Sequence, residues 1–563
     1  MKTPKGAILG LWDGHEAGVA ILQDGALVFA LSEERPSRRK RASGFPSLAL
    51  AKALDFSATR GIPITDVALA GRWGRAPLRL LEPWYAHSDP HRSPFSLPSR
   101  LVRAWENRVA QLPGARALES NVGILPVLRR VATVLGSRPR FHVVPHHDAH
   151  AASALLGGIR DDTLVVTWDA YGEGVAATAR THGGPPQVLP FSAGVASLYG
   201  GITVALGFKE GDEGKVMGLA CRGDPEASRD RFLGLFHVRQ GAPELTRPLT
   251  FGRVRRLLEG LSREDAAAGL QEATERLAGG WVQTLLDASP GPVRLLLAGG
   301  LFANVRLNQH LSMLPGVRSL YVFPNMGDGG LAAGAACATW MDLTGAPAQS
   351  AQSMALGVKY SAAQAELAAR ASHLPWRRVP SPVVAAAARL CAGQVVCLHS
   401  GRDEFGPRAL GQRSILFSPQ DPGLPERVNE GLGRDGFMPF APVLLSEQVS
   451  QLLSFPGADL DLTTMTVAVD GTDRFRETCP AAVHLDGSTR PQVVPKDGPE
   501  RVRRILEILP RLGGPPALIN TSFNLHGEPI VHTPGDALRT FARSGFDALY
   551  MGDLEIRGEH APH

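Results

Sequence analysis

The first part of the chain alternates short apolar runs with turn residues. Three largely apolar runs, separated by Asp-Gly pairs, lie at 8–11, 18–22 and 27–31. Runs of this length with Asp-Gly between them are typical of strands joined by tight turns. The pattern therefore predicts three short strands near the N-terminus.

The same strand–turn–strand pattern returns further along the chain. Residues 12–20 read WDGHEAGVA and residues 168–176 read WDAYGEGVA. An internal repeat of this kind predicts two similar subdomains that face each other, with a ligand in the cleft between them. The turn backbone can bind a phosphate, and an aspartate such as Asp13 can hold a metal beside it. We therefore expect an α/β fold with a duplicated, actin-like (ASKHA-type) nucleotide-binding domain.

Residues 74–140 interrupt this pattern. Prolines break their first part, and the residues at 101–112 have a helical pattern. We expect an insertion that decorates one subdomain.

A histidine pair opens an alanine-rich run. His146 and His150 are four residues apart on a predicted helix, so both imidazoles project from one face, the spacing at which two histidines share a metal. The alternative is a pair of capping or core histidines. Asp169 ends the repeated strand, and Asp328 lies in a glycine-rich turn between a strand and a helix. Two histidines with two aspartates favour a divalent ion with positions open to a phosphate.

Two other turns suit a nucleotide. Gly299 and Gly300 follow a buried-strand run and precede a helix start that contains Asn304, which predicts a phosphate or adenosine cradle. Lys215 lies in a glycine-flanked loop, GDEGK, and suits an anion. The alternative for this loop is an ordinary surface turn.

A polar stretch at 342–353 predicts a domain boundary, and arginines mark the second domain. Residues 401–414 place arginines among glycines after a predicted strand, and Arg490 adds another cation. Residues 520–524 (NTSFN) follow a further strand and offer short hydroxyl and amide groups. The alternative for each is a turn with solvated arginines, but their joint occurrence favours an anionic substrate.

Composition narrows the setting. The 563 residues, 44% hydrophobic and 20% charged, predict a globular protein of two or more domains. We expect no signal peptide and no membrane span, and the five scattered cysteines suit a reducing cytoplasm. A net charge of +5 is too dilute to argue for nucleic acid. The basic run at 35–41 is either a solvated loop or a rim that attracts anions.

Taken together, these motifs resemble the O-carbamoyltransferases of the nodulation-factor, cephamycin and tobramycin type. The resemblance covers nearly the whole chain and is carried by HHDAHAASA, VVTWDAYGEG, GDEGKVMGLA, LAGGLFANVRLN, GRDEFGPRALGQRSIL, STRPQVV and INTSFNLHGEPIV. It implies that residues 1–350 resemble the ATPases that make threonylcarbamoyladenosine in tRNA, and that residues 355–563 form a YrdC-like domain.

The resemblance also implies a mechanism. The YrdC-like domain would convert carbamoyl phosphate and ATP, with Mg, into carbamoyl-adenylate. The first domain, holding Fe(II), would transfer the carbamoyl group to a hydroxyl of a small-molecule, natural-product-like acceptor. His15 would be the general base on that hydroxyl, and the metal ligands would be His146, His150, Asp169 and Asp328. The residues that bind nucleotide or carbamoyl-adenylate would be Asp13, Lys215, Gly299, Gly300, Asn304, Arg408, Arg413, Arg490, Asn520, Ser522 and Asn524.

The chain departs from the family pattern in two places. The family usually has HDASAA after the first strand, where this chain has HEAG. Family members also carry a lysine and then RExWRPFAP or RExFRPFAP, but here the lysine is Gly433 and the second arginine is Met438. Two cations expected to hold phosphate are therefore missing, which points to an altered activation step or a different donor.

Two rival functions follow from the same residues. One is a threonylcarbamoyl-type tRNA-modifying enzyme. Binding of tRNA needs a strongly basic face, and the run at 35–41 is the one dense group of positive charges in the sequence, which counts against this function. The other is a non-catalytic nucleotide-binding protein with a degenerate activation domain. The acceptor and the oligomeric state cannot be read from the residues, which alone would accept Fe, Mn or Zn.

Overall fold

The chain forms two compact units. The computed structural model describes residues 6–71, 127–136, 138–181, 184–434, 436, 440–455 and 457–558. Unit 1 comprises residues 1–28, 43–351 and 457–460, and unit 2 comprises residues 29–42, 352–456 and 461–563. Each unit therefore includes one short segment from within the other's stretch of sequence. Most of the predicted insertion at 74–140 lies outside the described residues.

The first sheet of unit 1 contains the three strands that the apolar runs predict. Its order is β3-β2-β1-β4-β5. Strand β1 is antiparallel to β2 and parallel to β4, and β4 is parallel to β5. The bounds are β1 Ala7–Trp12, β2 Gly18–Gln23, β3 Ala26–Ser32, β4 Ile64–Ala70 and β5 Arg140–Val144.

The second sheet of unit 1 repeats this topology. Its order is β20-β12-β11-β6-β7-β8. Strand β6 is antiparallel to β7 and parallel to β11, and β11 is parallel to β12. The bounds are β6 Thr163–Gly172, β7 Val175–Thr181, β8 Gln187–Pro190, β11 Val293–Ala298, β12 Val317–Val322 and β20 Asp459–Leu460. Strands β1 and β6 occupy the same place in the two sheets, so the repeat seen in the sequence is a repeat of topology.

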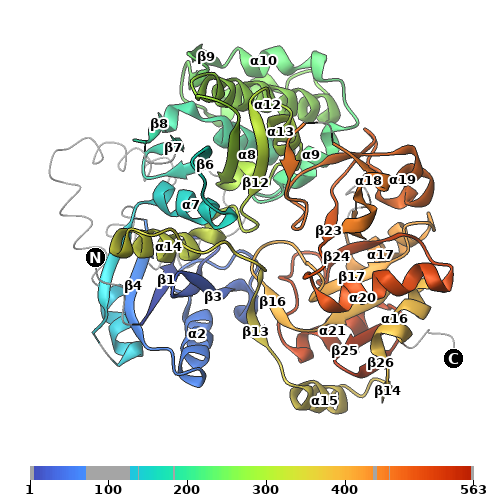
Figure 1. Ribbon diagram of the computed structural model, residues 1–563. Helices are drawn as coiled ribbons and strands as arrows, with labels where there is room; N and C mark the ends of the chain where they lie inside the picture. The colour runs from blue at the N-terminus through green and yellow to red at the C-terminus, as the bar shows by residue number, and fades with distance from the viewer. Residues whose placement is uncertain are drawn as a thin grey trace. The chain divides into compact units, whose positions relative to one another are not determined.

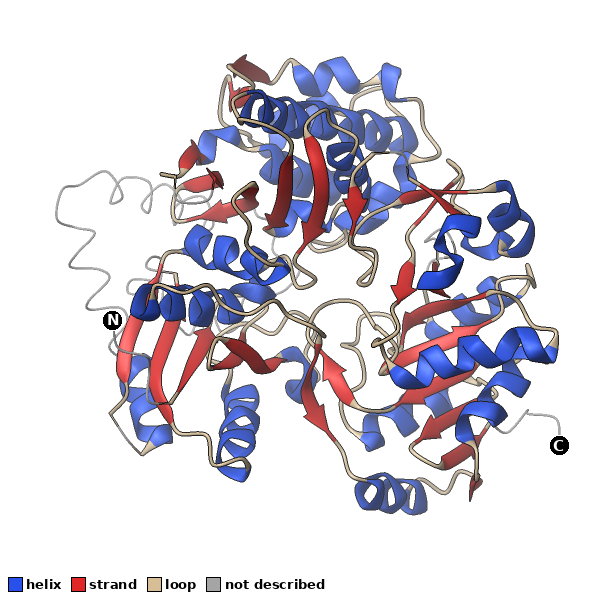
Figure 2. Ribbon diagram, viewed as in Figure 1, coloured by secondary structure: helices blue, strands red, loops and turns tan. Residues whose placement is uncertain are grey.

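The helices of unit 1 pack either on these sheets or on other helices (Figure 1, Figure 2). Their bounds are α2 Ser47–Thr59, α7 His146–Ala154, α8 Val195–Ala205, α9 Glu213–Ala220, α10 Arg229–Leu233, α11 Phe251–Leu257, α12 Arg263–Asp287, α13 Val305–Ser312 and α14 Leu331–Thr344. Helices α2, α7, α8, α13 and α14 lie against the sheets, and α9, α10 and α11 pack on other helices. A small hairpin, β9 Phe236–Arg239 and β10 Ala242–Leu245, joins α10 to α11. The mixed α/β class that the sequence predicts is confirmed.

Helix α14 packs unusually close to its neighbours, β1 and α7. A Cβ at Gly10 of β1 would lie 1.8 Å from the carbonyl oxygen of Ala332, and one at Gly334 would lie 1.8 Å from that of Ala149 in α7. No side chain fits at either point. The two glycines therefore determine how closely α14 approaches the strand and the helix that carry the predicted site.

Unit 2 is built on one mixed eight-stranded sheet with the order β14-β26-β25-β15-β17-β24-β18-β23. These strands are β14 Trp376–Arg378, β15 Val396–His399, β17 Arg413–Phe417, β18 Ala441–Leu445, β23 Gln492–Val494, β24 Ala517–Ser522, β25 Ala548–Met551 and β26 Leu554–Arg557. Shorter strands are β13 Ala355–Lys359, β16 Arg402–Glu404, β19 Leu453–Ser454, β21 Val469–Gly471 and β22 Ser488–Thr489. The helices are α1 Glu34–Ser37, α15 Ala362–Ala371, α16 Pro382–Cys391, α17 Leu424–Leu432, α18 Val449–Leu452, α19 Asp473–Thr478, α20 Glu500–Ile508 and α21 Pro534–Ser544.

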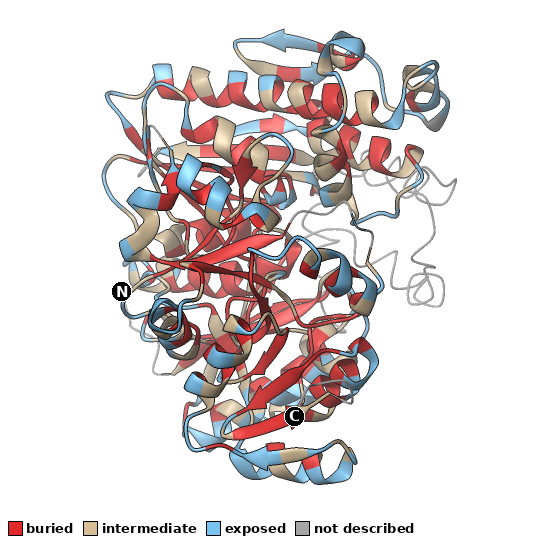
Figure 3. Cartoon of the chain, turned by 90° about the vertical axis from the view of Figure 1, so that its right-hand side faces the viewer, coloured by how far each residue is buried: buried red, intermediate tan, exposed pale blue. Residues whose placement is uncertain are grey.

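The sheet of unit 2 is buried on both faces (Figure 3). Helices α16 and α20 cover one face, where Leu390 and Ile505 join a core with Leu398 and Leu518. Helix α21 contacts β15 and β25 on the sheet. A sheet enclosed in this way is rigid, so loops at its strand ends are held in place.

One end of this sheet gathers the loops that carry the predicted substrate residues. The pairing places His399 beside Arg413, Ser414 beside Ser522, and Ala441 beside Asn520. Strand β23, which begins just after Arg490, is parallel to β18. The segments at 400–413, 490–492 and 522–524 and the start of β18 therefore meet at the same end of the sheet.

Among the residues that the structure describes, none of the helices is both long enough and apolar enough to cross a membrane.

Substituting Gly334 tests the close packing of α14. We expect Gly334→Ala to destabilise the protein by about 2–4 kcal/mol, because the new methyl group meets backbone that cannot move aside. Gly280→Ala is the matched control, since Gly280 is also helical but has open space around it. That change should be neutral or stabilise by about 0.5–1 kcal/mol. Chemical denaturation measures both, and equal effects would contradict the packing described.

Candidate functional site

Helix α7 brings two imidazoles together. It begins at His146 after Pro145, and its i, i+4 spacing places His150 one turn later on the same face. The two Nε2 atoms are 3.1 Å apart. Both side chains are buried, with 6% and 0% of their surface exposed.

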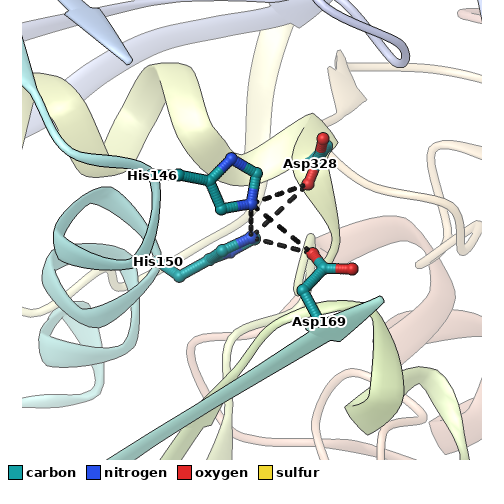
Figure 4. Close-up of side chains that lie close together, drawn as sticks. All are labelled: His146, His150, Asp169 and Asp328. Carbon is teal, nitrogen blue, oxygen red and sulfur yellow. Dashed lines mark hydrogen bonds and ion pairs between the residues drawn. The ribbon is translucent and has the colours of Figure 1, made fainter. Parts of the chain in front are cut away.

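Two carboxylates complete the cluster (Figure 4). Asp169 extends from β6, and its Oδ2 lies 3.1 Å from His150 Nε2 and 3.8 Å from His146 Nε2. Asp328 lies in the glycine-rich turn before α14, and its Oδ1 is 3.4 Å from each Nε2. The structure therefore brings together the four residues that the sequence predicts as metal ligands.

The geometry of this cluster fits a divalent metal. One ligand atom from each residue lies within 4.8 Å of all the others. Around an ion held at about 2.0–2.2 Å by histidine and aspartate, adjacent ligand atoms lie roughly 3.0–3.5 Å apart. Two nitrogens that converge at 3.1 Å and face two carboxylate oxygens match this arrangement. The donor set does not select among Fe, Mn and Zn.

Electrostatics hold a proton on the metal-free cluster. Burial alone would lower the pKa of His150, but hydrogen bonds and attraction to Asp169 and Asp328 outweigh it and raise the pKa to about 9. The pKa of Asp169 is well below its ordinary value, because its hydrogen bonds with His146 and His150 outweigh the opposing effect of burial. A metal ion must therefore displace a proton when it binds.

His15 lies beside the cluster on an exposed turn. Its Nε2 is 3.2 Å from Asp328 Oδ2, and 60% of its side chain is exposed. Its backbone carbonyl accepts a hydrogen bond of 2.7 Å from Trp12 Nε1. Glu16 accepts a hydrogen bond of 3.4 Å from the backbone N–H of Gly329. The two oxygens of Asp328 thus connect the buried histidines to an imidazole in contact with solvent.

The adjacent His147 has a structural role. Its Nδ1 lies 2.7 Å from Thr167 Oγ1, and its Nε2 lies 3.1 Å from the carbonyl oxygen of Val175. Burial, with the neighbouring histidines, lowers its pKa to about 3, so it stays neutral. It fastens α7 to the second sheet and leaves its two neighbours to face the carboxylates.

The other predicted residues of unit 1 differ in burial and in their contacts. Asp13 is buried just after β1. A Cβ at Gly300 would lie 3.2 Å from Asp169 Oδ1, so the Gly-Gly turn borders the cluster. Asn304 caps α13 through the N–H of Leu307, and Lys215 pairs with Asp212 at 3.4 Å. Nucleotide contacts for these residues stay predictions.

In unit 2, the loop that carries Arg408 is folded around one carboxylate. Glu404 Oε1 accepts hydrogen bonds of 2.8, 2.8 and 3.0 Å from the backbone N–H groups of Leu410, Gln412 and Arg413. The guanidinium of Arg413 is fully buried and pairs with Asp403 at 2.8 Å. Arg413 thus has a counter-ion inside the protein, and its predicted contact with substrate stays a prediction.

Arg408 and Arg490 are partly buried cations of a different kind. Burial lowers the pKa of Arg408 to about 10 and that of Arg490 well below its ordinary value, and repulsion by Arg408 lowers the latter further. Within the described part of the chain, neither guanidinium has an ion-pair partner. Two partly desolvated arginines that repel each other favour a bound polyanion, because its charge replaces the lost water.

Arg434 is a third such cation and was not among the predicted site residues. Its guanidinium donates to Thr521 Oγ1 at 2.9 Å and to Ser522 Oγ at 3.1 Å. It also contacts the backbone and side-chain oxygens of Asn524 at 3.1 and 3.3 Å. These partners are neutral, and burial lowers the pKa of Arg434 to about 10. The sequence did hold a signal for it, because Arg434 stands at the first arginine of the family stretch RExFRPFAP.

Asn520 is a support for this region. Its side-chain amide donates to the carbonyl oxygen of Ala409 at 3.1 Å and to Gln492 Oε1 at 2.6 Å. It thereby fastens the loop of Arg408 to the segment that follows Arg490.

Comparison with known proteins decides the family. The description "Carbamoyltransferase N-terminus" matches residues 124–337, and "Carbamoyltransferase C-terminus" matches residues 387–557. The nodulation protein NolO of Bradyrhizobium diazoefficiens is 31% identical over 73% of this chain and 78% of its own length. This chain belongs to the carbamoyltransferase family. The predicted enzyme class is confirmed.

A second curated relative is similar over nearly the whole chain. The nodulation protein NolNO of Sinorhizobium fredii is 29% identical to this carbamoyltransferase over 96% of the chain and 79% of its own length. Among solved structures, full-length HypF in its phosphate- and nucleotide-bound form matches at 12% identity with a TM-score of 0.32, covering 61% of this chain and 57% of HypF. A TM-score of that size does not show a shared fold.

The carbamoyltransferase has a structural reason for one departure from the family pattern. Gly433 ends α17 in the left-handed conformation, with φ of 63°, where a lysine would be strained. Met438 lies outside the described residues. Arg434 follows directly and supplies a cation in the same stretch.

Metal binding by the cluster should depend on pH. The pKa of His150 is raised from 6.5 to about 9, so between these pH values His150 keeps a proton that a free histidine would have lost. Affinity for Mn(II) should therefore rise with pH in this window, by up to about tenfold per unit. Calorimetry in two buffers of different ionisation enthalpy measures affinity and proton release together.

The controls for this titration use histidine variants. His150→Ala should lose binding, and His237→Ala, on an exposed strand, should leave it unchanged. A pH-independent affinity would contradict the protonated state.

Removing an uncompensated arginine should stabilise the fold and abolish anion binding. We expect Arg490→Gln to raise the melting temperature by roughly 2–4 °C, because a desolvated charge is lost. Pyrophosphate should raise the melting temperature of the wild type and not that of the variant. Arg474→Gln, at an exposed position, is the matched control and should behave as wild type. A destabilised Arg490→Gln would show that the cation has an unrecognised partner.

Proposed function

We propose that this carbamoyltransferase activates carbamoyl phosphate with ATP in unit 2 and delivers the carbamoyl group to a hydroxyl acceptor at the histidine–aspartate cluster of unit 1. The single observation that carries the proposal is the position of Asp328. One of its oxygens faces two buried imidazoles at 3.4 Å, and the other faces the exposed His15 at 3.2 Å. One carboxylate thus joins a metal-ready cluster to a base that an acceptor can reach.

The activation step suits the arginines at the end of the unit 2 sheet. ATP and carbamoyl phosphate are polyanions, and Arg408, Arg434 and Arg490 are partly desolvated cations that lack carboxylate partners among the described residues. To form carbamoyl-adenylate, water first hydrolyses carbamoyl phosphate to carbamate and phosphate. A carbamate oxygen then attacks the α-phosphorus of ATP, from which pyrophosphate leaves, so anions are present before and after the step. Ser522 and Asn524, already bonded to Arg434, provide further contacts. A YrdC-like domain at about 355–563 belongs to this proposal.

The transfer step suits unit 1, as an actin-like domain at about 1–350. A divalent metal held by His146, His150, Asp169 and Asp328, for which we favour Fe(II), would act as a Lewis acid on the carbamoyl donor. His15 accepts the proton of the acceptor hydroxyl at Nδ1, while its Nε2 faces Asp328, as the oxygen attacks the carbamoyl carbon. The bond from that carbon to the adenylate oxygen breaks, and AMP leaves. Asp328 orients the imidazole and stabilises the positive charge that it gains.

Product analysis separates the two steps. Purified protein is incubated with ATP, magnesium, Fe(II) and carbamoyl phosphate but no acceptor, and products are identified by mass spectrometry. We expect carbamoyl-adenylate, or AMP and pyrophosphate that form only when carbamoyl phosphate is present. His15→Ala should retain this activity, whereas Arg490→Gln should lose it.

Transfer to an acceptor found by screening should respond differently. His15→Ala should slow it by about 10²–10⁴-fold, the usual contribution of a general base. If no AMP forms with any metal, the adenylate mechanism is wrong. If His15→Ala transfers normally, the role of His15 is wrong.

A further inference from the structure

Two arginines of the basic run at 35–41 are inside unit 2. Arg35 is 2% exposed, so neither a solvated loop nor an anion-attracting rim describes it. The side chain of Arg38 is 26% exposed. Both belong to the segment 29–42, which packs with unit 2 although the preceding and following residues pack with unit 1.

Arg35 holds the start of the loop that carries Arg408. Its Nη2 lies 3.2 Å from the carbonyl oxygen of Glu404 and 3.2 Å from that of Gly406. The side chain of Glu404 holds the other end of this loop through three backbone N–H groups. The loop is therefore fastened at both ends, and Arg408 is two residues from a carbonyl that Arg35 binds.

Arg38 holds a second loop of the same region. Its Nη1 and Nη2 donate to the carbonyl oxygens of Ile530 and Pro529 at 2.6 and 2.7 Å. The next residue, Val531, donates from its N–H to the carbonyl oxygen of Phe523 at 2.9 Å. Arg38 thus supports the segment that lies against the Ser522–Asn524 turn.

These contacts require arginine. Arg35 reaches its two carbonyl oxygens with Nη2, and Arg38 reaches its two with Nη1 and Nη2. A rigid planar guanidinium with several N–H donors makes such paired contacts at little entropic cost. Burial lowers the pKa of Arg38, and repulsion by Arg35 lowers it further against the attraction of Asp536. Arg38 also pairs with Asp536, at 3.7 Å from its Nε. Two like charges are thus retained near each other, and between them they bind four loop carbonyls.

We infer that the segment 33–41 is a strap that positions the anion-binding loops of unit 2, with Arg35 placing Arg408 and Arg38 placing Ser522 and Asn524. This inference rests on the proposed activation step. Neither arginine needs to touch substrate: both are positioning residues that act through the loops.

Hydrogen exchange of the full-length protein tests the strap directly. The variants are Arg35→Met and Arg38→Met, and Arg39→Met is the matched control, an exposed arginine of the same run. We expect amide exchange to accelerate at least tenfold across 405–413 in Arg35→Met and across 525–532 in Arg38→Met. Arg39→Met should change neither segment, and exchange in the core strands should stay at the wild-type rate in all three.

Kinetics then separate positioning from a purely structural role. In the AMP-forming assay, Arg35→Met should raise the KM for carbamoyl phosphate roughly tenfold with a smaller change in kcat, and Arg35→Lys should recover part of the loss. Calorimetric affinity for pyrophosphate should fall in parallel, and this readout needs no turnover.

The outcomes distinguish two failures. Unchanged exchange in both variants, or faster exchange with unchanged pyrophosphate affinity, would overturn the strap. A wild type that binds pyrophosphate but forms no AMP would overturn the proposed function, while the exchange and affinity data would still decide the strap.

Discussion

The arrangement of unit 1 depends on how closely α14 packs. Gly10 and Gly334 allow backbone to touch backbone at two places along this helix. The first contact brings the helix onto the strand that leads to His15, and the second brings it onto the helix that carries His146 and His150. Asp328 lies just before the helix begins, so its carboxylate is placed between the two groups by main-chain packing, not by a flexible side chain. The spacing of a metal-ready cluster is thereby built into the fold.

The two units handle charge in opposite ways. In unit 1 the buried carboxylates face imidazoles, so a proton or a metal ion balances the cluster locally. In unit 2 the excess charge is positive. Arg413 pairs with Asp403, but Arg408, Arg434 and Arg490 are partly desolvated and have neutral or cationic neighbours. The loss of hydration around a cation without a counter-ion lowers the stability of a protein, and a protein tolerates this where a substrate supplies the missing negative charge. A metal-dependent transfer step and an anion-dependent activation step are the chemistry that each arrangement favours.

The departures from the family pattern have local explanations in part. A glycine at 433 is needed because α17 ends there in a left-handed turn, and the cation that follows, Arg434, binds the loop that contains Ser522. The segment 33–41 adds two more arginines to this unit from a distant part of the sequence. Arg434 matches the first arginine of the family stretch RExFRPFAP, and Arg35 and Arg38 act through the loops that they hold, so none of the three replaces the two missing cations directly.

Local pattern was enough to predict the strands around the first two turns, the topological repeat and the i, i+4 histidines, because strand alternation and helical periodicity act over a few residues. The sequence also determined the family, since its motifs extend over most of the chain. What it left undecided was which of several equivalent side chains face one another. Arg408 and Arg413 are alike in sequence, yet one has a buried aspartate beside it and the other does not. Arg35 read as a surface charge, and its burial follows from contacts with residues about 370 positions away. Tertiary structure alone decided these roles, because the partner that neutralises or desolvates a charge is chosen by packing and not by neighbours along the chain.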